Sequence, residues 1–161
     1  LEAMQMFCRS GIPLFVITNQ AGIAKGMYNI FTYEQLTRHM LWGFSRHGIT
    51  IEKVLYCPHH PRGSVPEFAI SCQCRKPETG LLRQAFLGRP DLRPEKCLLI
   101  GDKNSDIEAG LRLGLKTILV KTGHGQEHAA LTKADRIHDN LLAAARFLLQ
   151  TSARSGAQIP S

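Results

Sequence analysis

Short apolar runs alternate with helix-like segments along most of this chain, and this alternation limits the fold more than any other feature. Residues 14–17 and 97–100 are continuous apolar runs, as expected of strands that are covered on both faces. Strand-like segments also occupy residues 49–56 and 117–120, and helical patterns occupy 1–9, 79–87, 106–113 and 141–149. Strands alternating with helices predict a parallel α/β sheet of the Rossmann type.

One further helix is predicted from its first turn. Residues 32–35 (Thr-Tyr-Glu-Gln) have the spacing of a capping box, which opens many helices. The helix that follows is expected to bury four apolar side chains, Leu36, Met40, Leu41 and Phe44.

Length and charge narrow the functional class. With 161 residues the chain is long enough for one domain, expected over residues 1–150, whereas the small polar residues 151–161 predict a loose tail. The net charge is +7, but the basic residues are scattered and only 7% of residues are aromatic, so a small anionic substrate is favoured over nucleic acid. The sequence has no 18-residue apolar run and no secretory signal, and its five cysteines fit a reducing compartment. We therefore expect a cytoplasmic protein without a membrane partner.

Two close pairs of potential zinc ligands stand out in the middle of the chain. Cys57 and His59 form the first pair, and Cys72 and Cys74 form the second, with one residue between the members of each. Three sulfurs and one imidazole favour Zn²⁺ in a closed tetrahedral site, and four protein ligands make that zinc structural. His60 is the alternative nitrogen ligand, and a disulfide is the alternative use of the cysteines. Cys8 and Cys97 lie in apolar surroundings and are expected to be core thiols.

Polar side chains follow three of the predicted strands. Residues 18–22 (Thr-Asn-Gln-Ala-Gly) combine a hydroxyl with a turn whose free backbone N–H groups can cradle phosphate oxygens. Arg75 and Lys76 follow the second zinc pair, and Asp102 and Asp106 stand four residues apart after the strand at 97–100. Carboxylates so placed suit Mg²⁺. Because ligands bind at the carboxyl ends of parallel strands, the three segments together predict a phosphate–Mg²⁺ site.

The same segments resemble a known family. Thr18-Asn19, Lys76 and residues 101–106 are similar to the second, third and fourth motifs of the haloacid dehalogenase (HAD) superfamily of phosphatases. Within it, residues 16–26, 56–61, 72–77 and 101–103 resemble the heptose 1,7-bisphosphate phosphatases, which make a precursor of lipopolysaccharide heptose. The resemblance covers about residues 1–150 and implies a three-layer HAD-like fold with a zinc-stabilised loop insertion.

The first motif of that superfamily, Asp-x-Asp at the end of the first and central strand, is not found here, since the only acidic residue before Thr18 is Glu2. We interpret the chain as a fragment whose preceding strand and helix start, on the order of 30 residues, lie upstream. The nucleophilic aspartate and the acid/base aspartate are then expected in that segment, and the chain alone is expected to be inactive.

The resemblance also implies roles for residues that are present. Thr18 and Asn19, with Gln20 and Ala21, would bind the phosphoryl group, and Lys76 would neutralise the charge that develops on it. Asp102 would hold Mg²⁺, and Asp106 would orient Lys76 or the water ligands of the metal. Arg75 and Lys103 would contact the substrate, including its second phosphate. The implied reaction removes the 7-phosphate of a heptose bisphosphate, and the complete enzyme is expected to be a monomer.

Two other interpretations remain open. One is histidinol-phosphate phosphatase, a zinc-bearing relative in the same superfamily, although the 14 residues between Cys57 and Cys72 resemble the longer heptose-enzyme loop. The other is a non-catalytic binding module that zinc stabilises.

Overall fold

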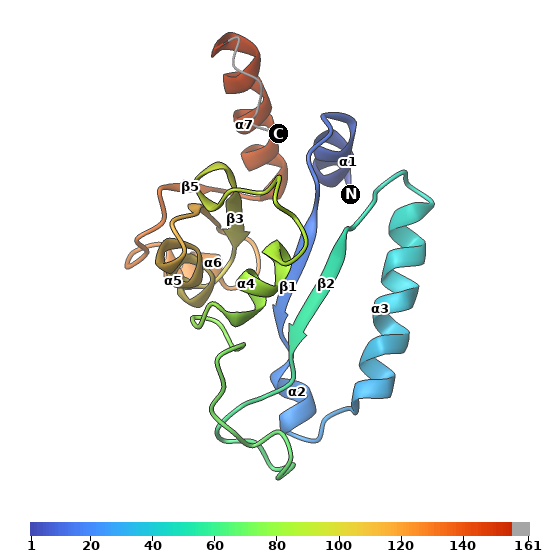
Figure 1. Ribbon diagram of the computed structural model, residues 1–161. Coiled ribbons are helices and arrows are strands. Elements are labelled where there is room, and N and C mark those ends of the chain that lie inside the picture. The colour runs from blue at the N-terminus through green and yellow to red at the C-terminus, as the bar shows by residue number, and fades with distance from the viewer. Residues whose placement is uncertain (156–161) are drawn as a thin grey trace.

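The computed structural model describes residues 1–155, and the side chains of residues 1–151, as helices packed around two small parallel sheets (Figure 1). In chain order the elements are α1 (Glu2–Arg9), β1 (Phe15–Asn19), α2 (Ala21–Ala24), α3 (Ile30–Ser45), β2 (Lys53–Cys57), α4 (Gly80–Phe86), the 3₁₀ helix η1 (Pro94–Lys96), β3 (Leu98–Gly101), α5 (Asn104–Arg112), β4 (Lys116–Val120), α6 (Gly125–His128), β5 (Arg136–His138) and α7 (Leu141–Ser155). None of the described helices is long and apolar enough to cross a membrane.

All strand pairs are parallel, but they form two separate sheets. β1 pairs with β2 from Phe15↔Lys53 to Asn19↔Cys57, and β3, β4 and β5 form the second sheet in that order. Within the described residues, β1 and β3 each pair on one side only. All residues of both strands line a cavity of about 1980 Å³, so the open edge of each sheet faces this space.

Helices cover both faces of the β3–β4–β5 sheet, which gives the predicted three layers. On one face Gly110 of α5 lies so close to Thr117 of β4 that a Cβ at Gly110 would need the Thr117 methyl group to move. On the other face Ile118 and Val120 pack against Ala144 of α7. Strict alternation along β4 therefore points successive side chains at different helices.

The two open edges leave their strands less buried than the sequence predicted. β4 is buried from Thr117 to Val120, whereas every residue of β1 and β3 retains partial exposure. The apolar runs at 14–17 and 97–100 do form strands, and their remaining exposure is explained by the open edges and does not require an uncovered face. The cavity that both strands line keeps one side of each accessible.

Several boundaries differ from the sequence-based expectations. α3 begins at Ile30 because Asn29, and not Thr32, is its N-cap, and the Asn29 side chain accepts the Thr32 N–H at 2.8 Å. Tyr33 is the buried residue of this helix and packs on Tyr56, whereas Leu36 is 65% exposed, so its predicted burial was wrong. The short elements α2, α6 and β5 were not predicted. α7 runs on to Ser155, into the segment expected to be a loose tail, and residues 156–161 of that tail lie outside the described residues.

Candidate active site and metal centre

The three polar segments predicted at strand ends line one cavity. Thr18 and Asn19 come from the end of β1, Arg75 and Lys76 from the loop after β2, and Asp102 and Lys103 from the end of β3. The cavity is the same one that separates the two sheets. The fold therefore brings together the residues that the sequence assigned to phosphate and magnesium, with the exception of Gln20, which does not line the cavity.

The Thr18 hydroxyl is held by a short chain of side-chain hydrogen bonds. Gln20 Nε2 donates to Thr18 Oγ1 at 3.0 Å, and the Tyr28 hydroxyl donates to Gln20 Oε1 at 2.7 Å. Because Thr18 Oγ1 accepts from Gln20, its own proton is available to a group in the cavity. Gly22 is required here, since a Cβ at this position would overlap the Tyr28 ring.

Part of the expected phosphate cradle is already used by the fold. The Gln20 N–H donates to Cys57 O at 2.8 Å, which extends the β1–β2 pairing by one residue. The expectation that the whole turn after β1 offers free N–H groups was therefore wrong at Gln20. Ala21, the first residue of α2, lines the cavity.

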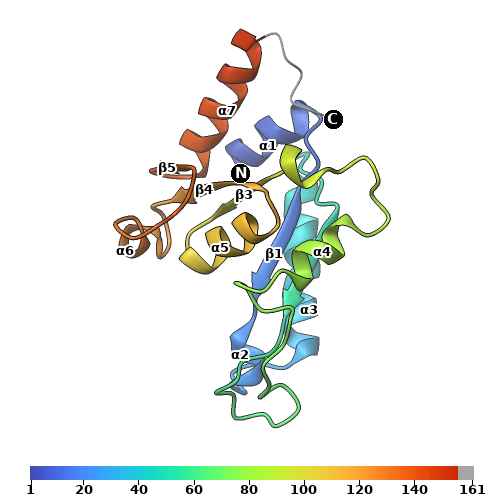
Figure 2. The same cartoon turned by 60° about the vertical axis from the view of Figure 1, so that its left-hand side comes forward.

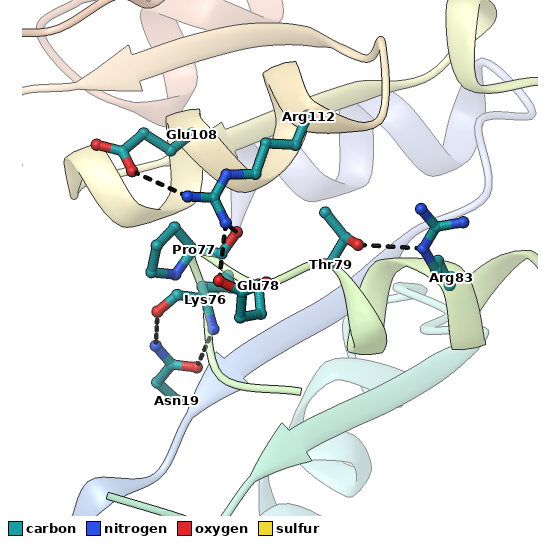
Figure 3. Close-up of polar contacts among 8 residues, drawn as sticks. All are labelled: Asn19, Lys76, Pro77, Glu78, Thr79, Arg83, Glu108 and Arg112. Atoms are coloured by element: carbon teal, nitrogen blue, oxygen red, sulfur yellow. Dashed lines mark hydrogen bonds and ion pairs between the residues drawn. The ribbon is translucent and has the colours of Figure 1, made fainter. Parts of the chain in front are cut away.

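Lys76 is fixed at both its backbone and its ammonium group. The Asn19 carboxamide accepts from Lys76 N and donates to Lys76 O, both at 3.0 Å (Figure 3). Lys76 Nζ forms an ion pair with Asp106 Oδ1 at 2.7 Å and donates to Ile17 O at 2.5 Å. The Lys76 and Asp106 side chains are only 9% and 8% exposed, so water screens this pair little. Lys76 thus joins β1 of one sheet to α5 of the other.

The two carboxylates after β3 have different partners. Asp106 Oδ2 accepts the Lys103 N–H at 3.1 Å and caps α5, so this carboxylate is committed to Lys76 and to the helix. Asp102 Oδ2 accepts the His124 N–H at 3.0 Å, which leaves Oδ1 without a hydrogen-bond partner among the described residues. Gly101 and Gly123 admit these carboxylates, since a Cβ at either glycine would collide with Asp106 or Asp102. Asp102 is the carboxylate that is left able to bind a cation.

A second helix contact fixes the segment after Lys76. Arg112 near the end of α5 donates from Nη1 to Pro77 O at 3.1 Å and to Glu78 Oε1 at 2.9 Å (Figure 3). Thr79 Oγ1 accepts from Arg83 at 3.1 Å at the start of α4. The loop that carries Lys76 is therefore tied to β1, α5 and α4.

The four predicted zinc ligands meet at one point. One ligand atom from each of Cys57, His59, Cys72 and Cys74 lies within 4.8 Å of all the others. The three sulfurs are 3.1–3.5 Å apart, and His59 Nδ1 is 3.3 Å from Cys74 Sγ and 3.7 Å from Cys57 Sγ. All five cysteines, including Cys8 and Cys97, are free thiols, so the alternative of a disulfide is wrong.

The donor set and its spacing fit a tetrahedral zinc ion. Zn–S bonds of about 2.3 Å place sulfurs about 3.8 Å apart in a tetrahedron, so the ligands need to move outward by only a few tenths of an ångström. Burial raises the pKa of the Cys57 and Cys74 thiols. Burial acts the same way on Cys72, but hydrogen bonds from Cys74 and the Arg75 backbone outweigh it and lower that pKa. A cation that binds thiolates would stabilise these crowded, partly buried cysteines in their deprotonated form.

His60 does not join this cluster. Its Nδ1 accepts the Arg62 N–H at 3.1 Å, and its ring lines the cavity instead. The choice of His59 over His60 as the fourth cluster member, made from the one-residue spacing, agrees with this geometry.

Some site residues were not found from the sequence. Tyr28 and His124 each form one hydrogen bond with a predicted residue, Gln20 and Asp102, and Arg112 forms two with Pro77 and Glu78, which follow Lys76. Such contacts depend on tertiary packing, and no local spacing in the chain signals them. Lys25 also lines the cavity and was named only as part of a motif.

Three comparisons relate this chain to known proteins. The HAD-hydrolase-like family model matches residues 73–144. The chain is 44% identical over 115 residues to a D-glycero-alpha-D-manno-heptose-1,7-bisphosphate 7-phosphatase of Photorhabdus laumondii, over 71% of this chain and 62% of that protein. It is 36% identical over 144 residues to the D-glycero-beta-D-manno-heptose-1,7-bisphosphate 7-phosphatase of Escherichia coli K12, over 88% of this chain and 74% of that protein.

The fold comparison agrees with these matches. A crystal structure of the D,D-heptose 1,7-bisphosphate phosphatase from B. bronchiseptica, in complex with magnesium and phosphate, superposes with a TM-score of 0.81 at 27% identity. The superposition covers 93% of this chain and 81% of the B. bronchiseptica chain. The present chain spans less than two thirds of the Photorhabdus protein and about three quarters of the E. coli protein. From the identity and coverage of the E. coli match, the chain belongs to the heptose-1,7-bisphosphate 7-phosphatase family of HAD-like hydrolases.

Proposed function

We propose that this chain supplies most of the active site of a Mg²⁺-dependent cytoplasmic phosphatase that removes the 7-phosphate of a D-glycero-D-manno-heptose 1,7-bisphosphate. The observation that carries the proposal is the convergence of Thr18, Lys76 and Asp102 on one cavity, with Lys76 held by Asp106. The relatives named for this activity support the choice of substrate.

Each of these residues has a chemical task in phosphoryl transfer. The free proton of the Thr18 hydroxyl, with the Asn19 amide and the turn at Ala21, binds phosphoryl oxygens. The Lys76 ammonium faces the charge that grows on the equatorial oxygens in the transition state. Lys103 and Arg75 contact the rest of the substrate. Because Asp106 already pairs with Lys76, its role is to orient that ammonium group.

Two metals fit the residues present. Asp102 would hold Mg²⁺, which neutralises phosphate charge when bound. Cys57, His59, Cys72 and Cys74 would hold a structural Zn²⁺ that fixes the loop between β2 and α4.

The nucleophile is proposed to lie on a strand that fills the cavity between β1 and β3. A carboxylate at the carboxyl end of such a strand would face Thr18, Lys76 and Asp102. Its oxygen attacks phosphorus, the bond from phosphorus to the sugar oxygen breaks, and a second acid protonates that oxygen. Water then hydrolyses the aspartyl-phosphate and releases inorganic phosphate. Among the described residues, Asp102 and Asp106 are the acids at this end of the cavity, and both have other tasks.

The test compares phosphate release by the 161-residue chain with release by a version extended at its N-terminus with an Asp-x-Asp strand. With Mg²⁺ and heptose 1,7-bisphosphate, the extended protein should turn over and the chain alone should not. Histidinol phosphate, offered in parallel, should be a poor substrate for both. Turnover by the chain alone near the extended rate would refute the assigned nucleophile, and preference for histidinol phosphate would refute the substrate.

A further inference from the structure

The segment between β4 and α6 packs against the Asp102 side chain. The His124 N–H donates to Asp102 Oδ2 at 3.0 Å, and it has no other acceptor among the described residues. Gly123 has a φ of +64°, and a Cβ at this position would overlap the same oxygen. A hydrogen-bond donor and the backbone of Gly123 therefore both face Asp102 Oδ2.

This segment is itself held in place by the sheet. At its start, the Lys121 N–H donates to His138 O of β5 at 2.9 Å. At its end, Gly125 is buried against the Val120 carbonyl, and a Cβ there would overlap that oxygen. Because both ends are fixed, the His124 N–H is presented to the carboxylate by a constrained backbone, while the His124 side chain is 56% exposed.

The two carboxylates after β3 leave one oxygen free for a cation. Asp106 uses Oδ1 for Lys76 and Oδ2 for the Lys103 N–H. Asp102 lines the cavity, and its Oδ1 has no hydrogen-bond partner among the described residues. Turning both Asp102 oxygens toward one ion would break the bond from His124, so this carboxylate is set to bind through Oδ1 alone.

Magnesium and calcium ions differ in what they need from a carboxylate. Mg²⁺ takes about six ligands at about 2.0–2.1 Å and keeps several waters, so one carboxylate oxygen suits it. Ca²⁺ takes about six to eight ligands at about 2.3–2.6 Å and often binds both oxygens of one carboxylate. We propose that the His124 N–H determines cation specificity, because by holding Oδ2 it makes Asp102 a one-oxygen ligand and so favours Mg²⁺ over Ca²⁺. The inference rests on the proposed function for the presence of a divalent cation, and it adds the backbone group that selects the ion.

The test measures cation binding, without turnover. The protein extended with an Asp-x-Asp strand would be titrated with MgCl₂ and with CaCl₂ by isothermal titration calorimetry. His124→Pro removes the N–H at a position whose φ of −90° is near the value that proline imposes. Ca²⁺ affinity should rise roughly 10-fold, since a hydrogen bond to a charged group no longer has to be broken, and Mg²⁺ affinity should change less than about 3-fold. His124→Ala keeps the N–H and removes only the exposed side chain, so both constants should stay within about 2-fold of the wild type.

A second measurement needs no variant, and it decides the question if His124→Pro does not fold. In the wild-type extended protein, saturating Ca²⁺ should speed hydrogen exchange of the His124 amide, because Ca²⁺ competes for Oδ2, whereas saturating Mg²⁺ should leave the amide protected.

Several results would overturn the inference. These are equal affinity changes for both ions in His124→Pro, no change for either ion, the same shift in His124→Ala, or a His124 amide that is equally protected with both ions. A wild-type extended protein that binds neither ion would overturn it as well. A protein that shows the His124-dependent preference for Mg²⁺ but does not hydrolyse the heptose bisphosphate would refute the proposed function and leave the inference standing.

Discussion

Replacing Asp106 by leucine should destabilise the fold strongly, because it leaves the Lys76 ammonium buried with only Ile17 O as a partner. Both side chains of the pair are below 10% exposure, and their charged atoms are 2.7 Å apart. Removing one member of a buried pair costs about 3–5 kcal/mol, since the remaining charge keeps its desolvation penalty and loses its counter-ion. With a urea m-value of about 2 kcal/mol/M, the unfolding midpoint should fall by roughly 1.5–2.5 M.

The chain offers a matched control ion pair for this prediction and a double variant that should restore the lost stability. Lys121 and Asp139 form an ion pair of similar length, 2.9 Å, but their side chains are 41% and 77% exposed. Asp139→Leu should therefore leave the urea midpoint unchanged within error, because water screens that pair. Lys76→Met combined with Asp106→Leu should recover most of the loss, since the double variant buries no unpaired charge. The urea midpoints would be measured by circular dichroism. Equal midpoint shifts for Asp106→Leu and Asp139→Leu would show that burial does not determine how much the Lys76–Asp106 pair stabilises the fold.

Three further outcomes are expected. Elemental analysis under reducing conditions should find one zinc per chain, and Cys74→Ser should lose it and loosen Arg75 and Lys76; a zinc-free wild-type protein would contradict this. In the extended enzyme, Lys76→Ala should lower kcat by about 10²-fold or more. Arg75→Ala should lower the activity on bisphosphate esters more than the activity on simple phosphate esters, and an equal loss on both ester types would remove the role given to Arg75. Hydrogen bonds from the Thr117 N–H and hydroxyl lower the pKa of Asp135 below its ordinary value of 3.8. The charged carboxylate therefore stabilises the fold above pH 3.8, and this contribution is lost as the pH falls through the lowered pKa. Asp135→Asn should flatten the acid side of the stability profile, and an unchanged acid slope would count against this linkage.

Much of the site was predictable because its chemistry is local. The one-residue spacing of Cys57–His59 and Cys72–Cys74 identified four atoms that the fold places within 4.8 Å of one another. The apolar runs located β1, β3 and β4, and parallel strands bring their carboxyl ends to one edge of a sheet. Residue type and strand order were sufficient for these predictions.

Other features depend on contacts that local patterns do not encode. β5 has three residues, two of them exposed, so it has no apolar run to detect. In α3 the helical period predicted a buried Leu36, but the residue that packs inward is Tyr33, against Tyr56 of β2. Asn29 caps that helix three residues before the Thr-x-x-Gln pattern that resembles a cap. The hydrogen bonds of Asn19 to Lys76 cross 57 positions of sequence, and only the folded chain brings these residues together.

The division of the molecule into two sheets has a consequence for its local opening. The two sheets are joined by apolar contacts, such as those of Ile17 near Leu99 and of α1 with α7, and by polar contacts of Lys76, Arg112 and the Arg146–Glu2 ion pair. In the turned view of Figure 2, α5 lies beside β1. Backbone amides in β4 have paired strands on both sides, whereas β1 and β3 each have one edge that no other described strand pairs. Amide hydrogen exchange should therefore divide into two cooperative units with different opening free energies, which meet at Lys76. The residue given the central electrostatic role in the proposed reaction also contacts both units, through Ile17 O and Asp106, so a ligand that engages Lys76 would slow exchange in both.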